Sequence, residues 1–164
     1  MSETFRVRVE EIRFDAAHFA TFGGGCEPLH GHSYHVNAEA EGVLTADSWV
    51  VDFTRLKSLV RELCKQLDHR FLLQLDSRKL EIASEETSWK VRTPDGTDYV
   101  FPKQDVAALP IDNTTAERLS EWLAAQAWQA LAEKGTKNLR SLTVEVYEGP
   151  GQSASFRMER LPLD

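Results

Sequence analysis

Apolar and polar residues alternate along the first forty positions, which predicts two β-strands. Over residues 5–19 the apolar positions are first odd-numbered, as in Phe5 and Val9, and then even-numbered, as in Ile12 and Phe14. One extra residue near Glu10–Glu11, a β-bulge, would keep both sets on one face. Residues 30–42 alternate again, after the Gly-rich turn TFGGGCEPL. We expect the two strands to pair as an antiparallel hairpin with a long connection.

Two later segments have the spacing of amphipathic helices. The first covers residues 52–67, with Asp52 or Thr54 as N-cap and Cys64 as a small buried residue of its apolar stripe. The second runs from about 115 to 134 and is stopped by Gly135. Thr114 and Glu117 have the spacing of a capping box at its start.

The remaining segments predict further strands. Residues 74–112 are less regular, but SWKVRT-PDG-TDYVF (88–101) indicates a hairpin around a Pro-Asp-Gly turn. SLTVEVYEG (141–149) is a strong strand, and the tail 151–161 is a candidate for another. The order of elements predicts an α+β fold, an antiparallel sheet with two helices on one face, in a single domain spanning 1–164.

Composition and charge narrow the function. The formal charge of −7 argues against broad nucleic-acid binding, which requires clustered Lys and Arg, yet a local cation could still bind an anionic small molecule. No apolar run approaches the roughly 20 residues that cross a bilayer, and MSETFRVRVE lacks the apolar centre of a signal peptide. Two cysteines are too few for a disulfide framework. We therefore expect a cytoplasmic protein with no membrane association.

Three histidines form a candidate metal site. His30 and His32 are two apart on a strand and project from one face, and His18 ends the neighbouring strand on the same side. Three imidazoles on rigid strands suit Zn²⁺ with one open position, which is typical of catalytic rather than structural zinc. A chance HxH on a strand would be the simpler interpretation. His35 lies on the opposite face and is expected to be a solvent-side residue.

Several further residues are candidates for chemistry, each beside a simpler interpretation. Cys26 and Glu27 lie in a loop that could reach an open metal position, where a cation would lower the thiol pKa; an inert half-buried Cys is equally compatible. Asp68-His69 could be a proton relay, although a His near a helix C-terminus is favoured by the helix dipole alone. Glu148 continues the inward parity of its strand and could bind the guanidine-like edge of a pterin or guanine, or lie at an exposed rim.

Six motifs in order carry a resemblance to a known family. They are FDAAH (14–18), CEPLHGHSY (26–34), VVDFTRLK (50–57), LDHRFL (67–72), NTTAERL (113–119) and VEVYEG (144–149). Together they resemble the 6-pyruvoyltetrahydropterin synthase / 6-carboxytetrahydropterin synthase family. Residues 76–111 fall outside the motifs, and the hairpin there is expected to be an insertion.

The resemblance implies a fold and a set of roles. The fold would be the tunnelling fold, a four-stranded antiparallel sheet with two helices on one side, assembled through trimers into a homohexamer with active sites between subunits. His18, His30 and His32 would hold Zn²⁺. Cys26, Asp68 and His69 would transfer protons, and Glu148 and Thr115 would bind the pterin.

The opening motif leaves the product open. Cys26 is separated from His30-Gly31-His32 by three residues, a spacing similar to that of the 6-carboxytetrahydropterin synthases of queuosine biosynthesis, which release acetaldehyde and triphosphate from 7,8-dihydroneopterin triphosphate. Glu27 is separated from His30 by two residues, a spacing similar to that of a variant that cuts the side chain to hydroxymethyl for folate synthesis. A 6-pyruvoyltetrahydropterin synthase and a non-catalytic zinc- and pterin-binding paralogue are also compatible with the motifs. A cupin-type metal enzyme shares the HxH pattern, but two long helices fit an all-β cupin poorly.

Overall fold

The computed structural model describes residues 3–160, and its main sheet has six strands rather than the expected four. The strand order is β11-β10-β4-β1-β5-β9. Four of these strands are antiparallel, as the alternation predicted: β1 (Phe5–His18), β4 (His30–Gly42), β10 (Leu139–Gly149) and β11 (Gln152–Glu159).

The two additional strands are parallel. They are β5 (Arg70–Gln74), which pairs with the end of β1, and β9 (Val106–Leu109), which pairs with β5. In β5 the four residues after Arg70 are all buried, so the strand shows no period-two pattern. A strand that is buried on both faces has a nearly continuous apolar sequence instead of an alternating one, so the alternation pattern did not reveal β5.

The register between β1 and β4 places the predicted metal ligands opposite one another. The predicted bulge is present, with a register shift between Val9 and Ile12 and a left-handed φ of 61° at Glu11. Beyond it, His18 pairs with His30 and Ala16 pairs with His32. The connection contains a short hairpin of β2 (Thr21–Phe22) and β3 (Gly25–Cys26), turned by Gly23 and Gly24 at positive φ. The bulge and this hairpin together bring the histidines to one end of the sheet.

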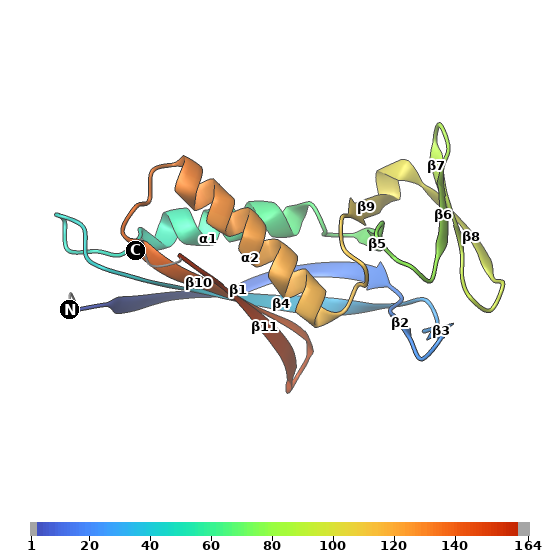
Figure 1. Cartoon of the computed structure of the whole chain (residues 1–164), viewed down its shortest axis with the longest axis horizontal. Helices are drawn as coiled ribbons and strands as arrows, with labels where there is room; N and C mark the ends of the chain where they lie inside the picture. The colour runs from blue at the N-terminus through green and yellow to red at the C-terminus, as the bar shows by residue number, and fades with distance from the viewer. Residues whose placement is uncertain (1–2, 161–164) are drawn as a thin grey trace.

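Both predicted helices lie on the same face of the sheet (Figure 1). They are α1 (Phe53–Lys65), capped by the Asp52 side chain, which accepts from the Arg55 backbone N–H at 2.7 Å, and α2 (Ala116–Glu133). Helix α1 packs on β1, and α2 packs on β10 and β11, around one apolar core that includes buried Cys64. Within residues 3–160 neither helix is long and apolar enough to cross a membrane.

The capping box predicted at the start of α2 is wrong. The N-cap is Thr115, and no side-chain hydrogen bond caps this helix. The Thr114 hydroxyl instead lies in the protein interior, 3.1 Å from the Phe19 carbonyl oxygen and 3.2 Å from Gln74 Oε1. Tertiary partners therefore outweighed the local capping interaction.

The hairpin predicted in segment 76–111 is part of a larger unit. It consists of β6 (Glu81–Ser84), β7 (Ser88–Arg92) and β8 (Asp98–Pro102), a three-stranded antiparallel sheet followed by a 3₁₀ turn at Lys103–Asp105. Figure 1 shows this small sheet at one end of the molecule, beside β5 and β9. It packs on a second apolar cluster that includes Phe19, Phe71 and Val91. The segment therefore lies against the end of the main sheet that carries the histidines.

Candidate active site

The three predicted histidine ligands converge at the end of strands β1 and β4. One ring nitrogen from each of His18, His30 and His32 lies within 4.8 Å of the others. The Nε2 atoms of His30 and His32 are 3.1 Å apart. Tetrahedral ligands at Zn–N distances of roughly 2.0–2.1 Å are separated by about 3.3 Å, so this spacing is close to one edge of a zinc site.

Hydrogen bonds leave the outward ring nitrogens available to a metal. His30 Nδ1 donates to the Pro28 carbonyl oxygen at 2.7 Å, and His18 Nδ1 donates to the Thr114 carbonyl oxygen at 2.9 Å, in the tautomers that place a lone pair on each Nε2. If His32 carried its hydrogen on Nε2, it could donate to His30 Nε2 but would leave His18 without a donor. The buried Nε2 of His18 would still have no partner among the described residues. A cation would accept the lone pairs of all three ring nitrogens, and the set of three imidazoles therefore fits Zn²⁺.

The buried histidine is also kept in its metal-binding protonation state. Burial, followed by the charge of nearby His30, lowers the pKa of His18 to about 4. A neutral imidazole is the form that coordinates a metal, so His18 needs no deprotonation at neutral pH.

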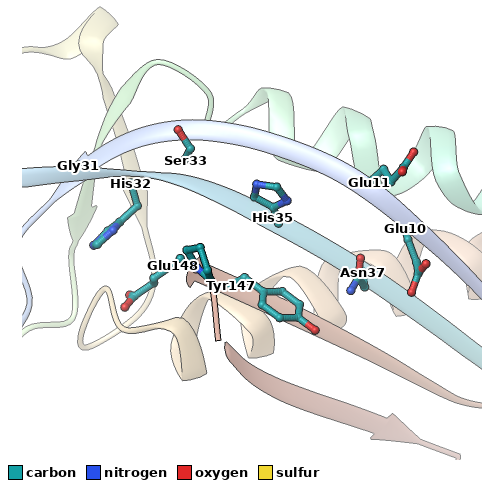
Figure 2. Close-up of a pocket in the computed structure, with 11 residues that line it drawn as sticks. Glu10, Glu11, Gly31, His32, Ser33, His35, Asn37, Tyr147 and Glu148 are labelled. Carbon is teal, nitrogen blue, oxygen red and sulfur yellow. The ribbon is translucent and has the colours of Figure 1, made fainter. Parts of the chain in front are cut away.

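A pocket of about 570 Å³ opens beside this group, between β1, β4 and β10. Figure 2 shows the His32 and Glu148 side chains pointing toward the same region at one end of the pocket, with Glu10 and Asn37 toward the other end. His35, expected to be a solvent-side residue, is half-buried in the pocket wall, and Tyr147 also lines it. The alternation along the strand placed His35 on the outer face but could not show that a pocket forms there.

Glu148 is half-buried in the pocket, as expected for a residue that continues the inward parity of β10. Burial raises the pKa of its carboxyl group, His32 counteracts this, and the negative charges of Glu27 and Glu117 raise the pKa further. A half-buried carboxylate is stabilised by charge-assisted hydrogen bonds from a ligand with paired N–H donors. Thr115 is half-buried at the N-terminus of α2, next to the Thr114 carbonyl that holds His18.

Cys26 and Glu27 occupy different surroundings. Cys26 is half-buried and packs against the second apolar cluster, where burial, then the charges of Asp95 and Glu27, raise its thiol pKa to about 11. The protein surroundings thus oppose the lowered pKa that the sequence suggested for a thiol beside a cation. The Glu27 carboxylate accepts from the Ala20 backbone N–H at 3.1 Å, and its charge acts on the pKa of both His18 and Glu148. Within this chain the acid is therefore in electrostatic reach of the histidines.

Asp68 and His69 form a pair, but not with the three histidines. His69 Nδ1 is 3.0 Å from Asp68 Oδ2, and the other Asp68 oxygen accepts from the Asp15 backbone N–H at 2.8 Å. The pair forms a cluster with Asp15 that is separate from the three histidines, and the His69 side chain is 78% exposed. His69 has a left-handed φ of 56° and lies beyond the end of α1, so a helix-dipole effect alone does not explain its position.

Comparison with known proteins decides the family. The model of the 6-pyruvoyl tetrahydropterin synthase family matches residues 7–159. The chain belongs to this family. It is an enzyme, a lyase of the kind this family comprises.

A sequence relative and two solved structures show how the resemblance is distributed. A Methanocaldococcus jannaschii protein, provisionally named 6-carboxy-5,6,7,8-tetrahydropterin synthase, is 33% identical over 149 residues, which cover 89% of this chain and 90% of that protein. The 6-pyruvoyl tetrahydropterin synthase of Plasmodium vivax is 33% identical, with a TM-score of 0.90 over 97% of this chain and 100% of that chain. A mutant of that enzyme, 32% identical with the same score and coverage, is described as altered at a catalytic glutamate. The Plasmodium structures therefore match this chain through segment 76–111 as well.

Proposed function

We propose that this enzyme cleaves the side chain of 7,8-dihydroneopterin triphosphate, with Zn²⁺ held by His18, His30 and His32. The observation that carries the proposal is the buried Nε2 of His18, which has no hydrogen-bond partner within residues 3–160. It lies close to the His30–His32 pair, beside a pocket that contains Glu148. The names of two relatives support 6-carboxy-5,6,7,8-tetrahydropterin as the product. Acetaldehyde and triphosphate would be released with it. This product would place the enzyme in queuosine biosynthesis.

The side chains have distinct tasks in this proposal. A bound Zn²⁺ would make the side-chain hydroxyl groups of the pterin more acidic. Glu148 would accept hydrogen bonds from the guanidine-like edge of the pterin and orient it, with Thr115 beside it. His69, oriented by Asp68, would carry a proton to or from the substrate.

A second copy of the chain is required to complete this site. Asp68 and His69 group with Asp15 and not with the zinc ligands of their own chain, and the His69 ring is largely exposed. We infer that His69 serves the zinc site of a neighbouring subunit in a homo-oligomer, with trimers paired into a hexamer. The free thiols of Cys26 and Cys64 fit a reducing cytoplasm, which we propose as the enzyme's location.

A second candidate product is 6-hydroxymethyl-dihydropterin. The position of the Glu27 carboxylate favours it, since this acid acts electrostatically on His18 and Glu148 while Cys26 packs against apolar residues. The similar Plasmodium vivax enzyme is also described with a catalytic glutamate. In this second reaction Glu27, and not Cys26, moves the proton beside the metal.

Mass spectrometry of the products distinguishes the candidates. The zinc-loaded wild type, Cys26→Ala and Glu27→Gln are each incubated with 7,8-dihydroneopterin triphosphate. The carboxylated product, lost in Cys26→Ala, supports the queuosine-type reaction; the hydroxymethyl product, lost in Glu27→Gln, supports the second candidate. Bound zinc and pterin without any turnover would contradict both and favour a non-catalytic paralogue.

A further inference from the structure

A fully buried amide lies behind the metal site. Gln74 is the last residue of β5, has no exposed surface, and follows Leu72 and Leu73, which are equally buried. Burying an amide is unfavourable unless its polar atoms find partners. A leucine would fill this position in an apolar strand, so the partners of Gln74 indicate why an amide is present.

Within residues 3–160, all side-chain hydrogen-bond partners of Gln74 lie in the two segments that flank His18. Its Nε2 lies 3.4 Å from both the Phe19 carbonyl oxygen and Asn113 Oδ1, and its Oε1 is 3.2 Å from the Thr114 hydroxyl. Phe19 directly follows His18 in the chain. Thr114 supplies the carbonyl oxygen that accepts from His18 Nδ1.

Asn113 closes the network on the other side. Its Oδ1 accepts from the backbone N–H groups of Thr21 and Thr114, both at 3.0 Å, and its Nδ2 donates to the Thr21 carbonyl oxygen at 2.8 Å. The chain after His18 and the chain that holds the His18 ring are thereby linked through two side-chain amides. Neither segment can shift without breaking hydrogen bonds in the protein interior, where they are costly to lose.

We propose that Gln74 is a positioning residue for the metal centre, which fixes the ring orientation and tautomer of His18 through Thr114 and Asn113. The inference rests on the proposed function, because it assumes that His18 binds zinc. Groups that orient a ligating histidine commonly change metal affinity by roughly 10- to 100-fold when they are removed. Gln74 also ends the strand that begins just after Asp68-His69, so one short strand supports both the proton relay and the zinc ligand.

The test is the Zn²⁺ affinity of the metal-free protein, measured by competition with a chelator. Gln74→Leu keeps the approximate side-chain volume and removes the amide, and we expect its dissociation constant for Zn²⁺ to rise roughly 10- to 100-fold. The absorption spectrum of bound Co²⁺ should change as well, since a reoriented His18 alters the ligand geometry. Ser141→Ala, which removes a buried hydroxyl at the far end of β10, is the control and should leave both measurements unchanged.

Thr114→Val provides an independent variant if Gln74→Leu does not fold. It removes the hydroxyl that contacts Gln74, which also lies 3.3 Å from His18 Nδ1, but keeps the backbone carbonyl that accepts from His18 Nδ1. It too should weaken Zn²⁺ binding. The double variant should lose less affinity than the two single losses combined, because both break one network. Wild-type affinity in a folded Gln74→Leu or Thr114→Val protein would overturn the role of Gln74. Failure of the wild type itself to bind Zn²⁺ would instead contradict the proposed function.

Discussion

The aromatic contact between segment 76–111 and the main sheet can be tested by Phe101→Ala. The Phe101 ring in β8 stacks on Phe71 in β5, with centroids 4.0 Å apart and an interplanar angle of 12°. Tyr99 lies beside both Phe101 and Phe19, with centroids at 5.7 and 5.4 Å. Removing the Phe101 ring should therefore loosen the small sheet from the strand that follows Asp68-His69.

The expected loss follows from the burial of the ring. A fully buried Phe replaced by Ala destabilises a protein by about 3–5 kcal/mol. Phe101 retains some exposure, so we expect about 2–3 kcal/mol, which includes the stacking contribution of the aromatic pair. At this chain length each kcal/mol lowers the melting temperature by roughly 2–4 °C, so the total shift should be roughly 4–12 °C.

Urea unfolding followed by circular dichroism measures the loss. Val100→Ala is the matched control, because Val100 is the preceding residue of the same strand, is 61% exposed and should change stability by less than about 0.5 kcal/mol. Equal unfolding midpoints for the two variants would refute the reasoning. So would a stability loss in Phe101→Ala that does not exceed the control.

Three further predictions concern the pocket, the Asp68-His69 pair and the sheet. Glu148→Ala should weaken pterin binding by about 1.5–3 kcal/mol in equilibrium dialysis, because charge-assisted hydrogen bonds are lost, and its zinc content should stay unchanged. The control variant Glu145→Ala should bind the pterin as the wild type does. The Asp15 backbone N–H, followed by His69, lowers the pKa of the Asp68 carboxyl group. A folded-state pKa below the unfolded value stabilises the protein above about pH 3.9, and this stabilisation is lost as the pH falls through the folded pKa. The wild type should therefore have a larger free energy of unfolding than Asp68→Asn at neutral pH, and the difference should disappear as the pH is lowered. A difference that does not change with pH would contradict the lowered pKa of Asp68. A Cβ on Gly42 would lie 2.5 Å from the Asn138 carbonyl oxygen, so Gly42→Ala should lose about 1–3 kcal/mol in thermal unfolding, whereas Gly149→Ala, with nothing within 4 Å, should not.

The helices and the four antiparallel strands could be predicted because their apolar spacing reports burial on one face. The bulge at Glu10–Glu11 was predictable for the same reason, since the change from odd to even apolar positions requires an extra residue. Strand β5 was missed because its run Phe71–Gln74 is buried throughout and does not alternate. The capping box failed because the Thr114 hydroxyl has partners in distant segments, which local spacing cannot show.

Strand alternation and spacing were enough to place His18, His30 and His32 on one face, and so to identify the residues that could form a metal site. How these residues are supported, and which candidates lie near them, depended on the folded chain. Only the fold places Cys26 against the second apolar cluster, and only the fold separates Asp68-His69 from the three histidines of the same chain that could hold a metal. Side-chain direction follows from local backbone geometry, whereas desolvation, hydrogen-bond partners and electrostatic surroundings depend on residues that are remote in the chain.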